Sequence, residues 1–234
     1  MNSMKLACVL VCLTVCVFGA SAQLYDRLFR TLMKGYTRDV MPRTSVNSTI
    51  NVKFNLQLIQ VHELSVSFQL LKTEVWLTLS WQDPRLRWDP AEFNNVQKMA
   101  VPAGKVWIPD IMLYNGASGI RAATVQALVY SDGSVFLIRP ATIRSRCPVL
   151  PGSDPTTCTL KFGSWVHNGN ELDLDFQGEH KADLTDYVPN YDFDIVNNTA
   201  VRNVILYDCC PEQYIDLSYK LTFRPAALRR RRRR

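Results

Sequence analysis

Residues Ile50-Asn51-Val52-Lys53-Phe54-Asn55-Leu56-Gln57-Leu58 decide the fold class, because apolar and polar side chains alternate along them. Successive side chains of a β-strand point to opposite faces of its sheet, so the alternation predicts a half-buried antiparallel strand. Further β-type segments follow, separated by Pro, Gly and Asn. They cover Ser65–Trp81, Lys105–Ile108, Thr124–Tyr130, Ser134–Arg139, Leu160–Val166, Glu171–Phe176, Val201–Tyr207 and Tyr214–Phe223. Many short strands with such punctuation predict a β-sandwich.

Two local signals complete the expected organisation. Leu24, Leu28 and Leu32 recur at helical spacing within residues Leu24 to Tyr36, with charged residues between them. This pattern predicts a short amphipathic helix before the strands. Ser131-Asp132-Gly133 separates two of the β-type segments and predicts a hairpin turn.

The N-terminal residues are expected to be a secretion signal. Lys5 precedes an apolar run from Leu6 to Phe18, and Ala20-Ser21-Ala22 forms a small-x-small cleavage signature. We therefore expect residues 1–22 to be removed and a single binding domain to occupy residues 23–228. No later run of about eighteen apolar residues predicts a membrane span, so the mature protein is expected to be soluble and extracellular.

Charge gives no evidence for nucleic acid as a partner. The net charge is +6, and Arg229 to Arg234 form an uninterrupted run of six arginines. Such a run is typical of a disordered tail or a tag, so the positive net charge comes mostly from the tail and not from a nucleic-acid-binding surface.

Two glycosylation acceptors fit secretion. They are Asn47-Ser48-Thr49 and Asn197-Asn198-Thr199.

The mature chain would keep four cysteines, Cys147, Cys158, Cys209 and Cys210. An even number in a secreted protein favours disulfides, but four cysteines allow three connectivities. Neighbouring Cα atoms lie about 3.8 Å apart, whereas ordinary disulfides span roughly 4.4–6.8 Å. A bond between Cys209 and Cys210 would therefore be strained and would stiffen a hairpin tip. Two free thiols, or two cysteines with separate partners, remain open alternatives.

Signatures of catalysis are missing. The sequence has no Gly-x-Ser-x-Gly, no phosphate-binding loop and no His-Glu-x-x-His. His62, His167 and His180 are far apart and do not have metal-ligand spacing. We therefore expect neither an enzyme nor a cofactor or metal site.

Five aromatic residues lie at strand ends or beside turns: Trp76, Tyr114, Trp165, Tyr207 and Tyr214. Any one of them can be an ordinary core residue. Together at loop bases they can face a common cavity, and each ring contributes about 0.5–2 kcal/mol to a desolvated cation. Several such rings form a cage for a quaternary ammonium group without a balancing carboxylate.

The chain resembles a known family, the ligand-binding domains of nicotinic-type Cys-loop receptors, and within that family the secreted acetylcholine-binding proteins. The resemblance covers nearly the whole mature chain. The motifs that carry it are Val75-Trp76-Leu77-Thr78-Leu79-Ser80-Trp81, Trp107-Ile108-Pro109-Asp110-Ile111-Met112-Leu113-Tyr114-Asn115, Lys161-Phe162-Gly163-Ser164-Trp165 and Tyr207-x-Cys209-Cys210-x3-Tyr214.

The resemblance implies an all-β, twisted immunoglobulin-like sandwich of about ten strands with an N-terminal helix. Five copies would form a ring, a homopentamer, with the ligand between neighbouring subunits. The principal face would supply Tyr114, Trp165, Tyr207, Tyr214 and the vicinal pair Cys209–Cys210. The complementary face would supply Trp76, Gln126, Leu128, Phe136 and Ile138. Asp110 would brace the loop of Trp165 rather than touch the ligand.

By the same resemblance, Cys147 pairs with Cys158 and Cys209 with Cys210. The loop between Cys147 and Cys158 is short and polar, and it lacks the apolar Phe-Pro-Phe-Asp tip of channel subunits. This difference and the lack of a predicted membrane span indicate a protein that binds but does not gate a channel. The resemblance implies that its ligands are acetylcholine and nicotine-like amines.

Three alternatives to a secreted binding protein stay open. The chain can be a channel ectodomain separated from its transmembrane part, or a structural or adhesive β-sandwich without a small ligand. An esterase acting on choline esters would need a nucleophile and a base that the sequence does not offer.

Overall fold

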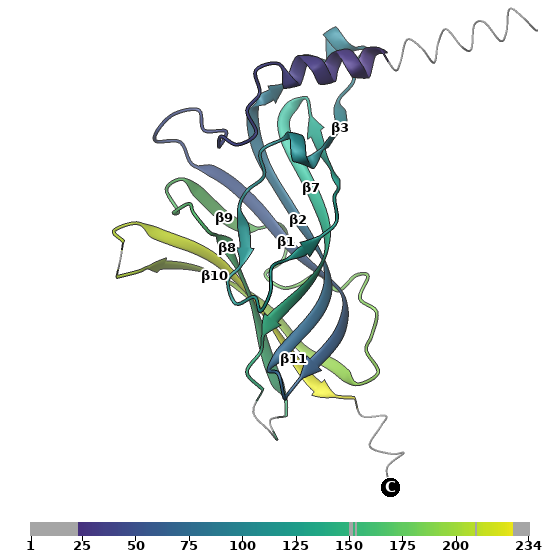
Figure 1. The fold of residues 1–234 in the computed structure, drawn as a ribbon, viewed down its shortest axis with the longest axis vertical. Helices are drawn as coiled ribbons and strands as arrows, with labels where there is room; N and C mark the ends of the chain where they lie inside the picture. The colour runs from purple at the N-terminus through teal and green to yellow at the C-terminus, as the bar shows by residue number, and fades with distance from the viewer. Residues whose placement is uncertain (1–22, 150–151, 153, 209, 227–234) are drawn as a thin grey trace, which may run out of the picture.

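Two β-sheets pack face to face in the computed structural model, which describes residues 23–149, 152, 154–208 and 210–226 (Figure 1). Aromatic side chains from both sheets meet in the core between them. The ring of Phe54 lies 4.9 Å from that of Phe162 and 6.1 Å from that of Tyr219, measured between centroids. The predicted β-sandwich is therefore confirmed.

The larger sheet has seven strands in the order β3-β6-β7-β2-β1-β9, with β5 paired to β7. Its pairs are antiparallel except β1 with β9, which run parallel. Its strands are β1 (Ile50–Ser65), β2 (Leu70–Arg87), β3 (Lys98–Pro102), β5 (Arg121–Ala122), β6 (Gln126–Tyr130), β7 (Asp132–Arg146) and β9 (Leu172–Phe176).

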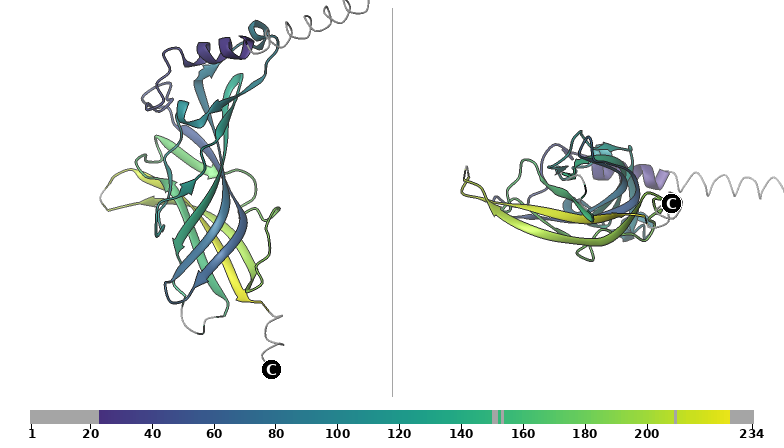
Figure 2. Two further views of the ribbon diagram at one scale, coloured as in Figure 1. Left: turned by 45° about the vertical axis from the view of Figure 1, so that its right-hand side comes forward. Right: turned by 90° about the horizontal axis from the view of Figure 1, so that it is seen from below.

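The smaller sheet has four antiparallel strands in the order β10-β11-β8-β4. Its strands are β4 (Ile111–Leu113), β8 (Thr156–Ser164), β10 (Phe193–Leu206) and β11 (Gln213–Pro225). The end of β10 and the start of β11 project from the body of the sandwich as a long hairpin, visible in yellow-green in both views of Figure 2. This projection places the turn between β10 and β11 beside the sandwich rather than within it.

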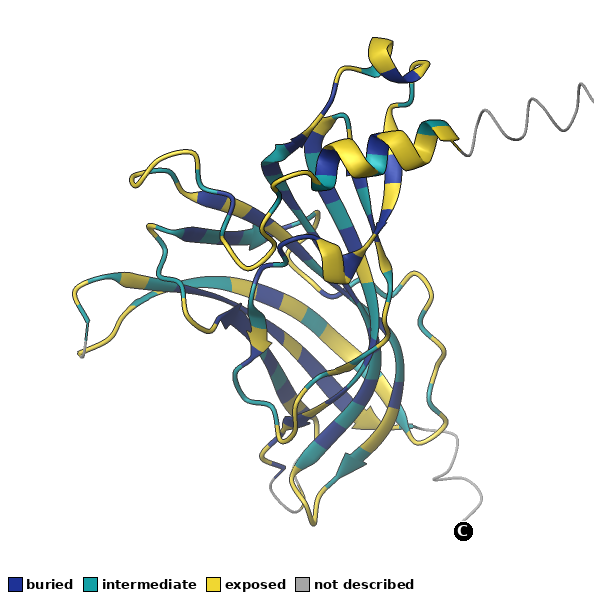
Figure 3. Cartoon of the chain, turned by 45° about the horizontal axis from the view of Figure 1, so that its top comes forward, coloured by how far each residue is buried: buried dark blue, intermediate teal, exposed yellow. Residues whose placement is uncertain are grey.

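The alternation that predicted β1 also explains its burial. Val52, Leu56 and Leu58 are fully buried, whereas the polar residues between them are exposed or half-buried. Figure 3 shows the same alternation of buried and exposed residues on neighbouring strands. Burial of one face per strand fixes the pairing register, because a slip by one residue would turn the apolar side chains to water.

A helix over residues 23–33 lies across one end of the sandwich (Figures 1 and 2). Leu28 and Leu32 are its buried residues, at 0% and 5% exposure, and they join the core. The helical periodicity is confirmed, although the helix ends before the predicted limit at Tyr36. Two short 3₁₀ helices, η1 (Pro90–Phe93) and η2 (Ala103–Lys105), connect strands nearby.

Some strand boundaries differ from the expectation. The predicted strand Lys105–Ile108 is wrong: Lys105 ends η2, and the three residues after it lie outside any strand. β3 (Lys98–Pro102) was not predicted, because its single pairing with β6 lies at the sheet edge and its sequence is short. Several strands are longer than expected, since β1 spans 16 residues and β2 spans 18.

The predicted hairpin turn at Ser131-Asp132-Gly133 is present between β6 and β7. Gly133 has a φ of +84°, which is unfavourable for residues with a side chain. A Cβ atom there would also lie 2.7 Å from the carbonyl oxygen of Asp83. Glycine is therefore required at this position.

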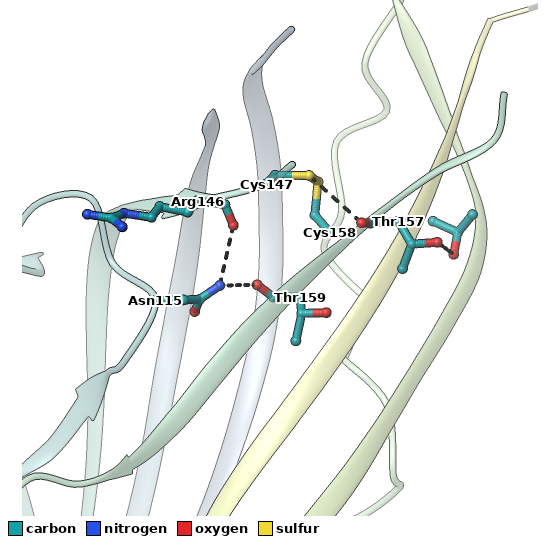
Figure 4. Close-up of a disulfide and its surroundings, with 7 residues drawn as sticks. Asn115, Arg146, Cys147, Thr157, Cys158 and Thr159 are labelled. Carbon is teal, nitrogen blue, oxygen red and sulfur yellow. Dashed lines mark hydrogen bonds between the residues drawn. A yellow bond between two sulfur atoms is a disulfide. The ribbon is translucent and has the colours of Figure 1, made fainter. Parts of the chain in front are cut away.

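A disulfide between Cys147 and Cys158 links the end of β7 to β8, and so joins the two sheets (Figure 4). The two Cα atoms are 5.0 Å apart. Beside it, the side-chain amide of Asn115 donates to the carbonyl oxygens of Arg146 (3.3 Å) and Thr159 (2.6 Å). These bonds hold the segment after β4 against both sheets.

Candidate functional site

A cavity of about 290 Å³ lies at the base of the β10–β11 hairpin. Three separate segments contribute to it: the residue after β4, the end of β8, and the hairpin itself. Its volume is close to the lower end of the range for small-molecule sites. It is lined by Tyr114, Ser164, Trp165, Tyr207, Cys210 and Tyr214.

The cavity brings together the described residues of the predicted principal face. Cys210 is disulfide-bonded. Cys209, its predicted partner, lies outside the described residues. Four aromatic rings therefore surround one space in the single chain.

Strand register explains why these side chains meet. Ile205 pairs with Tyr214, and Asp216 pairs with Gly163. Leu217 is fully buried in the core, so alternation turns its neighbour Asp216, and with it Tyr214, to the outer face of the smaller sheet. The cavity therefore sits on the outside of the sandwich rather than in its core.

The aromatic rings contact one another edge to face. The centroids of Tyr114 and Trp165 are 6.1 Å apart with planes at 67°. Those of Tyr207 and Tyr214 are 5.8 Å apart at 62°. Trp165 is 68% exposed and Tyr207 is 42% exposed in the single chain. Both rings are therefore accessible from outside the chain.

Gly163 permits the position of Tyr114. A Cβ atom at residue 163 would lie 2.5 Å from the Tyr114 hydroxyl oxygen and 2.7 Å from its Cζ. The Tyr114 hydroxyl donates a hydrogen bond to the carbonyl oxygen of Ser164. The wall of the cavity thus depends on a residue without a side chain.

Asp110 holds the loop that carries Trp165. Its Oδ1 accepts a hydrogen bond from the Ser164 hydroxyl (2.6 Å), and its Oδ2 accepts one from the backbone N–H of Val166 (2.8 Å). Its carbonyl oxygen accepts a bond from the backbone N–H of Trp165 (3.3 Å). Asp110 is not among the cavity-lining residues. These contacts are those expected of a residue that braces the loop.

The nearest buried acid is already neutralised. Asp216 has a side chain 2% exposed and forms an ion pair with Lys161 at 3.1 Å. It also accepts hydrogen bonds from Asn203 (2.7 Å) and Ser218 (2.8 Å). The Lys161 Nζ lies 5.7 Å from the centroid of Tyr114. The ion pair therefore supports the cavity without adding net charge to it.

Burial, followed by the Tyr207 phenol and the Asp216 carboxylate, raises the pKa of Tyr114 to about 12. Tyr114 is consequently neutral at physiological pH. The lining residues carry no formal charge, so what the lining itself offers a ligand is aromatic faces and backbone dipoles.

The predicted complementary residues lie elsewhere, on the larger sheet. Trp76 pairs with Pro140, and Ile138 pairs with Thr78 two residues further along. Val75 and Leu77 face the core, so alternation turns Trp76 outward. Gln126, Leu128 and Phe136 share this outer face, with Leu128 opposite Phe136.

The two sets of residues therefore occupy the outer faces of different sheets. None of the predicted complementary residues lines the aromatic cavity. A single chain does not bring them together.

Sequence reasoning missed several residues of the site. Ser164 lines the cavity, Gly163 makes room for Tyr114, and Lys161 with Asp216 forms the ion pair below. An acid between apolar residues of a predicted strand, as Asp216 is, was the available signal, because buried acids need partners.

The remaining predictions concern the glycosylation acceptors, the histidines, metal sites and membrane spans. Asn47 and Asn197 are exposed, as glycan attachment requires. His62 and His167 each lie beside a glutamate, at 3.3 Å and 3.1 Å. In the part of the chain that the structure describes, His, Cys, Asp and Glu side chains form no group of three suited to a metal. Across those same residues, no helix has the length and apolarity to cross a membrane.

Comparison with known proteins shows which family the chain matches. Residues 25–227 match the family model described as the neurotransmitter-gated ion-channel ligand binding domain. The chain is 38% identical over 212 residues to the neuronal acetylcholine receptor subunit alpha-2 of Pan troglodytes, which covers 88% of this chain and 40% of that protein. It is 35% identical over 238 residues to the acetylcholine receptor subunit alpha-like 2 of Drosophila melanogaster, covering 95% and 40%.

A solved structure shares the fold. The AChBP of Capitella teleta in complex with lobeline superimposes with a TM-score of 0.79 at 30% identity. The match covers 86% of this chain and 98% of that one. By contrast, the chain spans about 40% of the length of the receptor subunits that it matches.

Proposed function

This chain belongs to the neurotransmitter-gated ion-channel ligand-binding domain family, and on that premise we propose that it binds acetylcholine and other nicotinic cationic ligands. Quaternary or protonated amines, including nicotine-like molecules, would occupy an aromatic cage between subunits. The protein would do so without enzymatic activity and without channel activity.

The observation that supports this proposal is the composition of the cavity. Four aromatic rings surround about 290 Å³, and none of the lining residues carries a formal charge. Such a space suits an onium ion, whose charge interacts with the negative faces of Tyr and Trp rings. In this assignment Trp165, the most exposed ring, is the main partner of the cation.

The separation of the two half-sites supports assembly as a ring. One outer face of the sandwich carries the aromatic cavity, and the outer face of the other sheet carries Trp76 and Ile138. A head-to-tail contact between identical chains brings unlike faces together and closes as a ring. We therefore assign each ligand site to two neighbouring protomers of a homopentamer.

The tip of the β10–β11 hairpin would act as a lid over the cage. Cys210 lines the cavity and is disulfide-bonded, and we assign its bond to Cys209. A vicinal disulfide would stiffen the tip that Tyr207 and Tyr214 flank.

We propose that the protein is a secreted, soluble binder, with residues 1–22 as signal, 23–228 as the binding domain and 229–234 as a tail. The loop between Cys147 and Cys158 supports this choice, because it lacks the Phe-Pro-Phe-Asp tip of channel subunits. The second candidate is the extracellular domain of a receptor subunit, which the 38% identity to such a subunit favours. Immunoblots of soluble and detergent-extracted tissue fractions separate the two, since a subunit with membrane spans needs detergent.

A ligand titration tests the proposal. Addition of carbamoylcholine should quench or enhance tryptophan fluorescence saturably, and light scattering should give the mass of five chains. A monomer with no saturable response at millimolar ligand would refute the proposal and leave a structural or adhesive sandwich. Hydrolysis of acetylcholine during incubation would instead indicate an esterase.

A further inference from the structure

We propose that Glu74 is the counter-charge of the complementary half-site and that His62 positions its carboxylate. This role rests on the proposed function, and in it Glu74 selects cationic over neutral ligands. The geometry of β1 and β2 around Trp76 supports it.

Glu74 and Trp76 share the outer face of the larger sheet. β2 pairs with β7 without a register shift from Leu70 to Gln82, and Glu74 lies opposite Thr142. Residues two apart on a regular strand point the same way and are about 7 Å apart. The carboxylate of Glu74 is therefore a near neighbour of the Trp76 indole.

The opposite strand is irregular at this position. Pairing of β1 with β2 shifts between Leu58 and Gln60, and again between Val61 and Glu63. His62 falls within the second irregularity, and its Nε2 lies 3.3 Å from the Glu74 Oε2. β-Bulges redirect side chains and often occur beside functional sites.

The irregular stretch of β1 is also braced from outside. The carbonyl oxygen of Ile59 accepts a hydrogen bond from the backbone N–H of Val188 (2.8 Å). The carbonyl oxygen of Val61 accepts one from the Asn190 side chain (2.7 Å). Both bulges are thus fixed, which holds His62 against Glu74.

The charges around Glu74 leave its carboxylate available. Lys72 is the next outward residue of β2, and it pairs across the sheet with Glu63 on one side and Arg144 on the other. Glu74 has uncharged residues opposite it, Gln60 on β1 and Thr142 on β7, and its side chain is 46% exposed. A cation placed over Trp76 therefore has Glu74 as a near acidic neighbour on β2.

The aromatic cavity makes such a counter-charge useful. Its lining carries no formal charge, and Asp216 below it is neutralised by Lys161. Rings attract cations but also bind neutral apolar groups. A carboxylate two residues from Trp76 on the same face of β2 adds a preference for positive charge, and this preference weakens with salt.

The test measures carbamoylcholine affinity for Glu74→Gln, which keeps the size and a polar end while removing the charge. We expect a three- to tenfold weaker Kd and a shallower dependence of Kd on NaCl concentration than in the wild type. His62→Lys, which places a permanent cation beside Glu74, should weaken binding by a similar factor. Glu74→Asp should recover part of the loss.

Glu63→Gln is the matched control, because it removes an acid from the same sheet but opposite Lys72, further from Trp76. It should leave the Kd and its salt dependence unchanged. Equal affinity and salt dependence of Glu74→Gln and the wild type would overturn this inference alone. Failure of the wild type to bind carbamoylcholine would overturn the proposed function as well.

Discussion

Replacement of Gly163 by alanine tests how the cavity wall is built. The added Cβ would lie 2.5 Å from the Tyr114 hydroxyl oxygen and 2.9 Å from the carbonyl oxygen of Ile215. Contacts this short cannot persist, so the Tyr114 ring must move and β11 must shift slightly. The hydrogen bond from Tyr114 to Ser164 would be lost with that movement.

The magnitude follows from these contacts. Overpacking of a tight site costs about 1–3 kcal/mol, and a lost hydrogen bond costs about 1 kcal/mol. We therefore expect Gly163→Ala to lower the free energy of unfolding by about 2–4 kcal/mol. Displacement of one ring of the cage removes up to about 1–2 kcal/mol of cation–π interaction, so ligand affinity should fall about five- to thirtyfold.

Denaturant unfolding and fluorescence titration measure the two effects separately. Gly169→Ala is the first control, because its Cβ would crowd Ile215 at 3.1 Å but not Tyr114. Gly119→Ala is the second, since its Cβ would meet nothing within 4 Å. Gly169→Ala should lose stability with little change in affinity, and Gly119→Ala should lose neither.

A double variant decides whether Tyr114 transmits the effect. In Tyr114→Ala the clash with a Cβ at Gly163 is relieved, so the two substitutions should cost less together than the sum of their separate effects. Wild-type affinity in Gly163→Ala, or full additivity in the double variant, would refute the reasoning.

Three further predictions concern the same site. Trp165→Ala should weaken carbamoylcholine binding by about 2–4 kcal/mol while changing unfolding free energy little, because the side chain is 68% exposed; unchanged affinity would remove Trp165 from the site. Asp110→Asn should weaken binding about tenfold, because the amide keeps one acceptor oxygen and cannot accept from both Ser164 and Val166. Wild-type hydrogen exchange at Val166 in Asp110→Asn would contradict this role. Folding raises the pKa of Tyr114 from 10.0 to about 12, so the contribution of its neutral phenol to stability is complete below pH 10 and is lost as the pH rises toward 12. Tyr114→Phe should therefore lose less unfolding free energy than the wild type between pH 10 and pH 12. The same loss in both proteins would count against this role of Tyr114.

The strand pattern predicted much of the fold. Alternation in Ile50 to Leu58 identified β1 because one face of that strand is buried, and Gly133 marked a turn because its φ is positive. The same reasoning failed at Lys105–Ile108, where Lys105 ends η2 and the next three residues form no strand. A run of four residues has too few positions to distinguish a strand from a connecting segment.

The site was predicted in part. The motifs singled out the aromatic residues, and the structure places Tyr114, Trp165, Tyr207 and Tyr214 around one cavity. The contribution of Gly163 was not foreseen, because it arises from a contact with Tyr114 across 49 positions of sequence. Contacts of that range depend on strand register, which local patterns do not contain.

By itself, the sequence determined which side chains alternate, where glycine permits a turn, and which family the motifs resemble. Only the tertiary structure decided that Asp216 is paired with Lys161, that two bulges bring His62 to Glu74, and that the half-sites lie on opposite outer faces. The physical reason is that burial patterns are local properties of a strand. Distances between strands follow from how the sheets pair and pack.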